Sequence, residues 1–190
     1  MGGKLTSATV CSANPHKLAE FRDLFPGFDL ELLGAADYPE ENGATYRENA
    51  LIKAHHGRRI GPSGRLMLAD DSGIEVAALG GAPGVVTARW AEGRHVEKLL
   101  TALDGREDRA ARYVCELVAV RPDASEVFGR GVLEGRVALA AAGSEGFGFD
   151  PLFVPDGEER TVAELGDAWK AEHSHRARAA RALLASLGAG

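Results

Sequence analysis

Two adjacent carboxylates, Asp70 and Asp71, follow an apolar run in the stretch LADDSGIEVAALGGAPG. An acid beside apolar residues needs a cation, a metal ion or hydrogen-bond donors, because burying an unpaired charge is costly. Mg²⁺ takes one or two carboxylates with phosphate oxygens and water, so DDSG fits a corner that holds metal and phosphate, where Ser72 and Gly73 let the backbone approach a ligand. The same residues fit a polar turn between two strands. Both interpretations stay open on these residues alone.

Cations with the spacing to meet phosphates occur upstream. Lys17 lies in the first turn of a helix that follows SANPHK, and the N–H groups at a helix N-terminus suit an anion. Lys53 shares a helix face with Asn49, four residues earlier, and Glu41 offers an acid in the preceding loop. Each of these residues also fits a solvated surface position, and SANPHK is not a G-x-x-x-x-G-K-[ST] phosphate loop.

The segment GSEGFGFDP, residues 143–151, places two aromatic residues in a Gly-rich loop. Phe147 and Phe149 could stack on a planar base, and Asp150 could accept hydrogen bonds from ring N–H groups. The competing interpretation is that both rings fold back onto the core.

Basic residues gather near the C-terminus, where Lys170 precedes His175 and Arg176. A guanidinium can donate two parallel hydrogen bonds to a keto oxygen or a phosphate, although a solvated basic turn would look the same. Taken together, these segments supply phosphate donors, a metal corner, a stacking loop and an Arg/His pair. Those are the parts of a nucleoside triphosphate site.

Composition limits the class of protein. The chain has 190 residues, 45% of them hydrophobic and 26% charged, which fits one globular domain over residues 1–190. The net charge of −6 gives no basic surplus for binding nucleic acid. Cys11 and Cys115 lie in apolar runs and are expected to be reduced thiols. No segment reaches 18 uninterrupted apolar residues, so we expect a cytoplasmic protein with no membrane partner.

Periodicity predicts the elements that must position these side chains. A helix is expected after Asn14 and Pro15, and another begins at the capping box of Thr45 and Glu48 and ends near Arg59. Further helices are predicted at 95–103 and 174–187. Strands are predicted at 5–11, 28–33, 66–70, 74–79, 112–122 and 126–140, the last two antiparallel. The fold class is α/β, with helices packed around a long twisted sheet.

Five motifs occur in a fixed order between residue 8 and about residue 183: SANPHKLAEF, EENGATYRENALIKA, ADDSGIEVAALGGAPGVVTARWA, GFGFDPLFVP and KAEHSHRARA. In combination they resemble the inosine/xanthosine triphosphate pyrophosphatase family, the Ham1-like non-canonical purine NTP pyrophosphatases. The resemblance implies a long twisted mixed sheet flanked by helices, two lobes with a central cleft, and a homodimer. It also implies hydrolysis of ITP, dITP and XTP to the monophosphate and pyrophosphate, with Mg²⁺ as cofactor.

The same resemblance assigns roles to individual residues. Glu41 and Asp71 match metal-binding acids, and Asp71 also matches the proposed general base, which we expect Asp70 to support. The matched substrate-binding residues are Ser12, Ala13, Asn14, Pro15, His16 and Lys17 on the triphosphate side, Lys53, Ser72 and Arg89, Phe147, Gly148, Phe149 and Asp150 in the base loop, and Lys170, His175 and Arg176 near the C-terminus.

The chain departs from the family pattern at five places, and the mildest is Ala13, where many members carry glycine or another small residue. Glu145 adds an acid near the base, His173 replaces an apolar residue, Ala177 replaces glycine, and the segment after Ala91 is short. Two alternatives therefore stay open. One is a Maf-like pyrophosphatase of pyrimidine or modified nucleotides, and the other is a nucleotide-binding protein without catalysis.

Overall fold

The computed structural model describes residues 6–12, 16–34 and 37–188, and within them the chain divides into two compact units. The first unit comprises residues 1–71, 116–130 and 179–190, and the second comprises residues 72–115 and 131–178. The prediction of a single catalytic domain over residues 1–190 stays a prediction.

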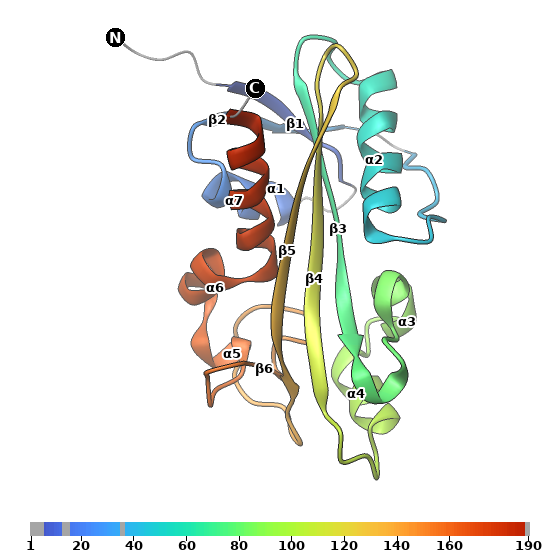
Figure 1. Cartoon of the computed structure of the whole chain (residues 1–190), viewed down its shortest axis with the longest axis vertical. Helices are drawn as coiled ribbons and strands as arrows, with labels where there is room; N and C mark the ends of the chain where they lie inside the picture. Colours follow the sequence, from blue (N-terminus) through green and yellow to red (C-terminus); the bar gives the residue numbers. More distant parts are fainter. Residues whose placement is uncertain (1–5, 13–15, 35–36, 189–190) are drawn as a thin grey trace. The chain divides into compact units, whose positions relative to one another are not determined.

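Six strands form one sheet in the order β2-β1-β3-β4-β5-β6 (Figure 1). β1 pairs in parallel with β2 and β3, whereas β5 and β6 are antiparallel, so the sheet is mixed, as predicted. The strands are β1 Thr6–Val10, β2 Phe28–Leu32, β3 Leu66–Val76, β4 Ala110–Val120, β5 Glu126–Val137 and β6 Phe153–Pro155.

The four helices predicted from periodicity are confirmed within a few residues. Thr45 and Glu48 form the predicted capping box at the start of α2. Asn14 and Pro15, the expected start of α1, lie outside the described residues. The helices are α1 His16–Leu24, α2 Tyr46–Ile60, α3 Thr87–Ala91, α4 His95–Ala102, α5 Val162–Leu165, α6 Asp167–His173 and α7 His175–Gly188, with 3₁₀ turns at Ala77–Leu79 and Gly84–Val86.

β3 differs from its prediction. The division into strands at 66–70 and 74–79, and with it the polar-turn interpretation of DDSG, is wrong, because one continuous strand runs from Leu66 to Val76 and residues 77–79 form a 3₁₀ turn. Gly73 permits this path: a Cβ there would lie 2.4 Å from the hydroxyl of Thr87 and 2.6 Å from the carbonyl oxygen of Gly84. The glycine thus admits a neighbouring chain segment. The sequence analysis instead predicts that a ligand approaches the backbone at Gly73.

In the first unit, α2 and α7 cover opposite faces of the sheet (Figure 1). Ala50 and Ala54 of α2 pack with Met67 and Val118 in one hydrophobic cluster. On the other face, Gly129 of β5 lies so close to α7 that an added Cβ would meet the backbone of Ala179–Leu183 at 2.2–2.5 Å. Side chains alternate across a strand, so each face has its own core.

The second unit has a separate core, made of apolar residues from β3, α4, β4, β5 and the segment before β6. Ile74, Leu99, Tyr113, Phe149 and Phe153 are among its buried members. This core fixes one end of the base loop. Among the described residues, no helix is both long and apolar enough to cross a membrane.

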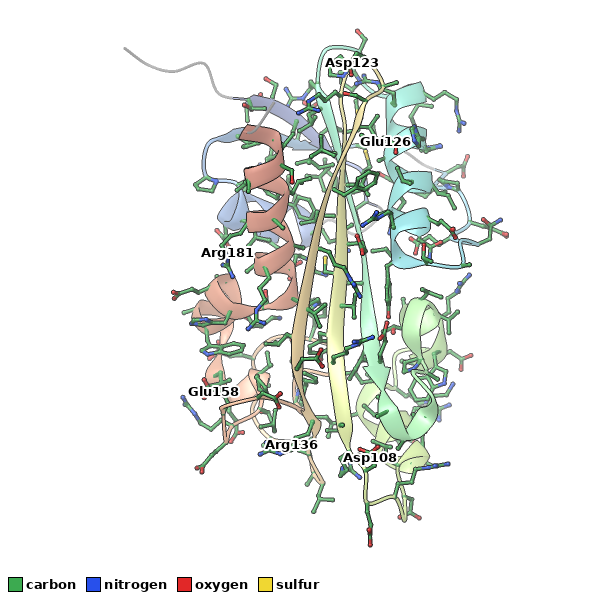
Figure 2. All side chains as sticks on the ribbon, viewed as in Figure 1. Asp108, Asp123, Glu126, Arg136, Glu158 and Arg181 are labelled. Carbon is green, nitrogen blue, oxygen red and sulfur yellow. The ribbon has the colours of Figure 1, made fainter. Side chains whose placement is uncertain are left out.

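The turn that joins β4 to β5 carries exposed charge. Figure 2 shows Asp123 on this turn and Glu126 at the start of β5. Asp123 accepts hydrogen bonds from the backbone and hydroxyl of Ser125, at 2.9 and 2.7 Å. Asp123 therefore serves the turn itself, whereas Glu126 Oε1 lies 2.6 Å from His55 Nε2 of α2.

Candidate functional site

The first unit gathers an acid–lysine cluster around Asp71. Asn49 Nδ2 donates to Asp71 Oδ2 at 3.0 Å, and Lys53 Nζ lies 3.7 Å from Asp71 Oδ1. The same ammonium donates to Glu41 Oε1 at 3.0 Å. Asn49 and Lys53 are one turn apart on α2, so the helix presents both to the strand, and the structure brings the two predicted metal-binding acids to one cation.

Burial sets the electrostatics of this cluster. Burial raises the pKa of Asp71 above its ordinary value, although Lys53 and the hydrogen bond from Asn49 oppose the shift. Burial also opposes the charge on Lys53, but Asp70, Asp71 and Glu41 outweigh it and raise the pKa of this lysine. Asp71 is therefore a stronger base than a surface aspartate, beside an amine that stays protonated.

Asp70 has a different partner. Its side chain points to the opposite face of β3 from Asp71, where Lys17 Nζ donates to Asp70 Oδ1 at 2.5 Å. The carboxyl is 2% exposed, so this ion pair compensates a buried charge. The expected support of Asp71 by Asp70 is not a direct contact, and Asp70 instead holds Lys17 of α1.

The oxygen donors around Lys53 fit a magnesium ion. Glu41 and Asp71 both direct a carboxylate oxygen toward one ammonium group, which shows that the two acids can meet at a common cation. The described residues hold no group of three or more His, Cys, Asp or Glu side chains able to bind a metal. Two carboxylates suit Mg²⁺, which keeps waters and substrate phosphates in its shell.

In the second unit, the base loop is built around the carboxylate of Asp150. Its Oδ2 accepts from the backbone N–H of Phe147 and from Lys170 Nζ, both at 2.8 Å, and its Oδ1 accepts from the hydroxyl of Tyr113 at 3.3 Å. Asp150 is 5% exposed and ties three chain segments together. Its predicted contact with a base stays a prediction.

The two loop aromatics have separate environments. Phe149 is 3% exposed and packs on Trp90 and His95, so for this ring the core interpretation is correct and the stacking interpretation is wrong. Phe147 is 60% exposed, and Lys170 Nζ lies 4.3 Å from its ring centroid. Only Phe147 offers a ring to a planar ligand.

Arg176 and His175, near the C-terminus, contact residues of β3 and β4. Arg176 is buried, and its Nη2 donates to the hydroxyl of Ser72 at 3.1 Å. The ring of His175 stacks on Tyr113, with centroids 4.8 Å apart and planes at 23°. The solvated-turn interpretation is therefore wrong for Arg176, because the guanidinium is oriented within the second unit.

The remaining predicted residues are less constrained. Arg89 is exposed on α3, and no ion pair holds it among the described residues. Ser12 is buried after β1, and Gly148 has a left-handed backbone with φ of 65°. Ala13, Asn14 and Pro15 lie outside the described residues, and His16 is the first residue of α1.

Glu145, the unexpected acid, has a structural role. Its Oε2 accepts from the backbone N–H of Asp167 at 2.9 Å, at the start of α6. A Cβ at Gly166 would meet this carboxylate oxygen at the same 2.9 Å, so the glycine makes room for it. Glu145 thus ties the base loop to the helix that carries Lys170. Of the other departures, His173 is exposed against Trp169 and Ala177 is buried.

Two functional candidates were missing from the sequence-based site. Asn49 is fully buried and also accepts from the backbone N–H of Gly43 at 2.8 Å, which links the loop before α2 to Asp71. In the sequence, the only indication that Asn49 belongs to the site is its four-residue spacing from Lys53. Tyr113 lies within an apolar strand pattern, where nothing distinguishes it from an ordinary core aromatic.

Comparison with known proteins finds relatives over the same part of the chain that carries the five motifs. A model of the Ham1 family matches residues 8–186. A dITP/XTP pyrophosphatase of Deinococcus radiodurans is 42% identical over 192 residues, which cover 98% of this chain and 95% of the relative. One of Nitratidesulfovibrio vulgaris is 40% identical over 200 residues, covering 95% of this chain and 96% of the relative.

Solved structures agree in fold. A HAM1 protein from Coxiella burnetii superposes with a TM-score of 0.85 at 33% identity, covering 98% of this chain and all of the other. A nucleoside-triphosphatase, dITP/XTP pyrophosphatase, from Mycobacterium abscessus gives a TM-score of 0.75 at 39% identity, covering 96% of this chain and all of the other. With matching motifs, sequence and fold over nearly its whole length, the chain belongs to the Ham1 family.

Proposed function

We propose that this protein hydrolyses non-canonical purine nucleoside triphosphates, namely ITP, dITP and XTP, to the monophosphate and pyrophosphate, and so cleanses the nucleotide pool. The observation that carries the proposal is the cluster in which the buried Asp71 and Lys53 meet the half-exposed Glu41. Relatives that are 40% or more identical over nearly the whole chain are named dITP/XTP pyrophosphatases. The cluster supplies a base and a cation for hydrolysis of a phosphoanhydride.

In this mechanism, Asp71 accepts a proton from the attacking water, and the anhydride between the α and β phosphoryl groups is cleaved. Burial raises the pKa of Asp71, which strengthens it as a base, and Asn49 orients the carboxylate through Oδ2. Lys53, and Lys17 on the other face of the strand, provide positive charge for the phosphates. The products are the nucleoside monophosphate and pyrophosphate.

Magnesium belongs to the same proposal. Glu41 and Asp71 would hold the ion, because their oxygens already converge on one cation. A bound Mg²⁺ supplies charge neutralisation and orientation of the phosphates. Lys53 then acts as the neighbouring cation that balances the two acids.

Base selection rests on Arg176 and the loop around Asp150. A keto oxygen at C6 accepts from a guanidinium, whereas the amino group of adenine leaves that donor unpaired, and a site built on such a donor discriminates strongly. Ser72 and the surrounding burial hold Arg176 in one orientation, which favours selection over general attraction. Phe147 offers an exposed ring for the base.

A nucleotide panel tests the function. The protein is incubated with Mg²⁺ and ITP, dITP, XTP, GTP, ATP or UTP, and pyrophosphate release is measured. We expect release from ITP, dITP and XTP well above the other three. Preference for UTP would favour the Maf-like alternative, and binding without release would favour a nucleotide-binding protein.

The substitution Asp71→Asn tests the base. We expect it to lower ITP turnover by at least 100-fold while circular dichroism stays that of the wild type, because the amide retains the shape of the side chain but accepts no proton. Asp123→Asn, on the exposed β4–β5 turn, is the matched control and should keep wild-type turnover. Near-normal ITP hydrolysis by Asp71→Asn would overturn the assignment.

We also propose a cytoplasmic homodimer, on the strength of the family resemblance. Sedimentation equilibrium of the purified chain measures its mass directly. A species of twice the 20.0 kDa chain mass is the expected result, and a monomer at micromolar concentration would contradict it.

A further inference from the structure

Tyr113 of β4 is a buried tyrosine that contacts two predicted substrate-binding segments of the second unit. One segment is the base loop, through Asp150, and the other is the C-terminal segment, through His175. The side-chain oxygen of Tyr113 lies 3.3 Å from Asp150 Oδ1, in the base loop. Its ring packs on His175 at 4.8 Å between centroids and on Phe153 at 4.3 Å. Tyr113 is 7% exposed, so these contacts make up most of its environment.

The loop that Tyr113 reaches is shaped by a single carboxylate. Asp150 accepts from the backbone of Phe147 and from Lys170, and its own N–H donates back to the Phe147 carbonyl at 3.1 Å. Gly146 has φ of 74°, and a Cβ there would lie 2.3 Å from Asp150 Oδ2. Because the loop closes directly over the carboxylate, any rotation of Asp150 moves Phe147 and Lys170 with it.

Tyr113 limits that rotation. Lys170 and the Phe147 N–H both bind Oδ2, so the hydroxyl of Tyr113 is the donor that holds the other oxygen, Oδ1. A buried hydroxyl needs a partner, and a bond to a charged acceptor is stronger than one between neutral groups. Burial raises the pKa of Tyr113 well above its ordinary value, so the phenol keeps its proton and acts as a hydrogen-bond donor.

The ring of Tyr113 acts on the second segment. The imidazole of His175 is stacked at 23° on the phenol ring, which defines the plane of that side chain immediately before Arg176. The phenol ring also packs on Phe153, a fully buried residue, with ring centroids 4.3 Å apart. One rigid aromatic residue therefore sets both the rotation of the base loop and the plane of His175.

We propose that Tyr113 is a positioning residue for nucleobase recognition: its hydroxyl fixes the loop of residues 147–150 through Asp150, and its ring fixes His175. The inference rests on the proposed function and adds to it a residue that determines base selectivity without touching the substrate. All of its named contacts lie in the second unit, whereas the acid–lysine cluster around Asp71 lies in the first. Tyr113 should therefore govern nucleotide affinity and selectivity, and leave the hydrolytic step largely unaffected.

Tyr113→Phe separates the two contacts, because phenylalanine retains the stacked ring and loses the hydroxyl. We expect the KM for ITP to rise about tenfold, because a tenfold change corresponds to the loss of one hydrogen bond to a charged group. The value of kcat should change less than twofold. The preference for ITP over GTP should fall. Tyr113→Leu, which removes the ring as well, should raise KM further and lower the preference further.

A matched control and an activity-independent readout complete the test. Tyr38→Phe removes a tyrosine hydroxyl that donates to the Leu33 carbonyl in the first unit, and it should leave KM and selectivity unchanged. Isothermal titration of ITP without Mg²⁺ should show the same weakening for Tyr113→Phe, and thermal unfolding of each variant shows whether it is folded at the assay temperature.

The outcomes distinguish this inference from the proposed function. If the wild type hydrolyses ITP and Tyr113→Phe shows unchanged KM, binding and selectivity, the positioning role is wrong and the proposed function stands. A fall in kcat alone, equal for every nucleotide, would also overturn it. If the wild type binds ITP without hydrolysis, the proposed function fails, and titration of the Tyr113 variants still decides the positioning role.

Discussion

At the residue scale, Lys53 holds together acids that would otherwise repel each other. Its ammonium lies 3.0 Å from Glu41 Oε1 and 3.7 Å from Asp71 Oδ1, and the lysine side chain is 9% exposed. Chemistry on phosphates needs both signs of charge, and this arrangement keeps the acids close in the protein alone. We therefore expect both the stability of the protein and its proposed function to depend on the Lys53 side chain.

Replacing Lys53 by methionine should cost about 3 kcal/mol of unfolding free energy at pH 7, because it leaves buried carboxylate without its counter-charge. Asp71 already has a raised pKa, and loss of the lysine raises it further, so the folded variant binds a proton more tightly than the unfolded chain. The deficit should consequently shrink as pH falls. Urea titrations at pH 7 and pH 5 measure it.

Arg59→Met, an exposed change on the same helix, is the control and should cost less than 1 kcal/mol at both pH values. An equal deficit for Lys53→Met at both pH values would mean that lost packing, and not unpaired charge, explains the destabilisation.

At the element scale, the close approach of α7 to β5 depends on one missing side chain. A Cβ on Gly129 would lie 2.2 Å from the carbonyl oxygen of Ala179 and 2.5 Å from the backbone nitrogen of Leu183. Backbone atoms cannot rotate away as a flexible side chain does, so any larger residue forces the helix from the strand. The small residues along α7 serve the same packing.

Gly129→Ala should therefore lower the free energy of unfolding by about 1–3 kcal/mol, the usual cost of overpacking. Gly64→Ala is the matched control, because a Cβ at Gly64 has no heavy atom within 4 Å. Chemical denaturation of both variants gives the comparison. If Gly129→Ala is no less stable than Gly64→Ala, the contact with α7 is looser than the structure indicates.

Predictability also differs from element to element. α2 begins with its own capping box at Thr45 and Glu48, a local signal that was enough to place its start. β3 was divided at DDSG because aspartate, serine and glycine favour turns, but ion pairs and neighbouring segments keep the strand continuous. The short elements α5, α6 and β6 have too few residues to show a period.

At the scale of the whole molecule, buried ionisable groups set the alkaline limit of stability. Cys11 is 1% exposed, packed beside Met67, and burial raises the pKa of its thiol from 9.0 to about 12. Between these values the unfolded chain releases a proton that the folded chain retains. The contribution of Cys11 to stability is therefore fully present below pH 9 and is lost as pH rises toward 12.

Between pH 9 and pH 10, we expect the unfolding free energy of the wild type to fall more steeply than that of Cys11→Ala. The difference between the two slopes should approach about 1.4 kcal/mol per pH unit, the value for release of a single proton. Burial and, after it, Cys11 raise the pKa of Tyr38, so the difference in slope reports the thiol together with its coupling to Tyr38. Denaturant titrations at four pH values from 8 to 10 provide the measurement. Identical slopes would show that the thiol ionises in the folded state as readily as in the unfolded chain.

The sequence by itself determined the family, the α/β class and the order of the long elements, and it predicted which acids and cations belong to the site. Those features are carried by local patterns and by motifs of fixed residues. Only the tertiary structure decided the hydrogen-bond and ion-pair partners of the buried polar residues. Asp70 pairs with Lys17, Asp71 with Asn49 and Lys53, and Asp150 with Tyr113. The physical reason is that a buried charge or hydroxyl is defined by the neighbours that compensate it, and chain segments distant in sequence supply those neighbours.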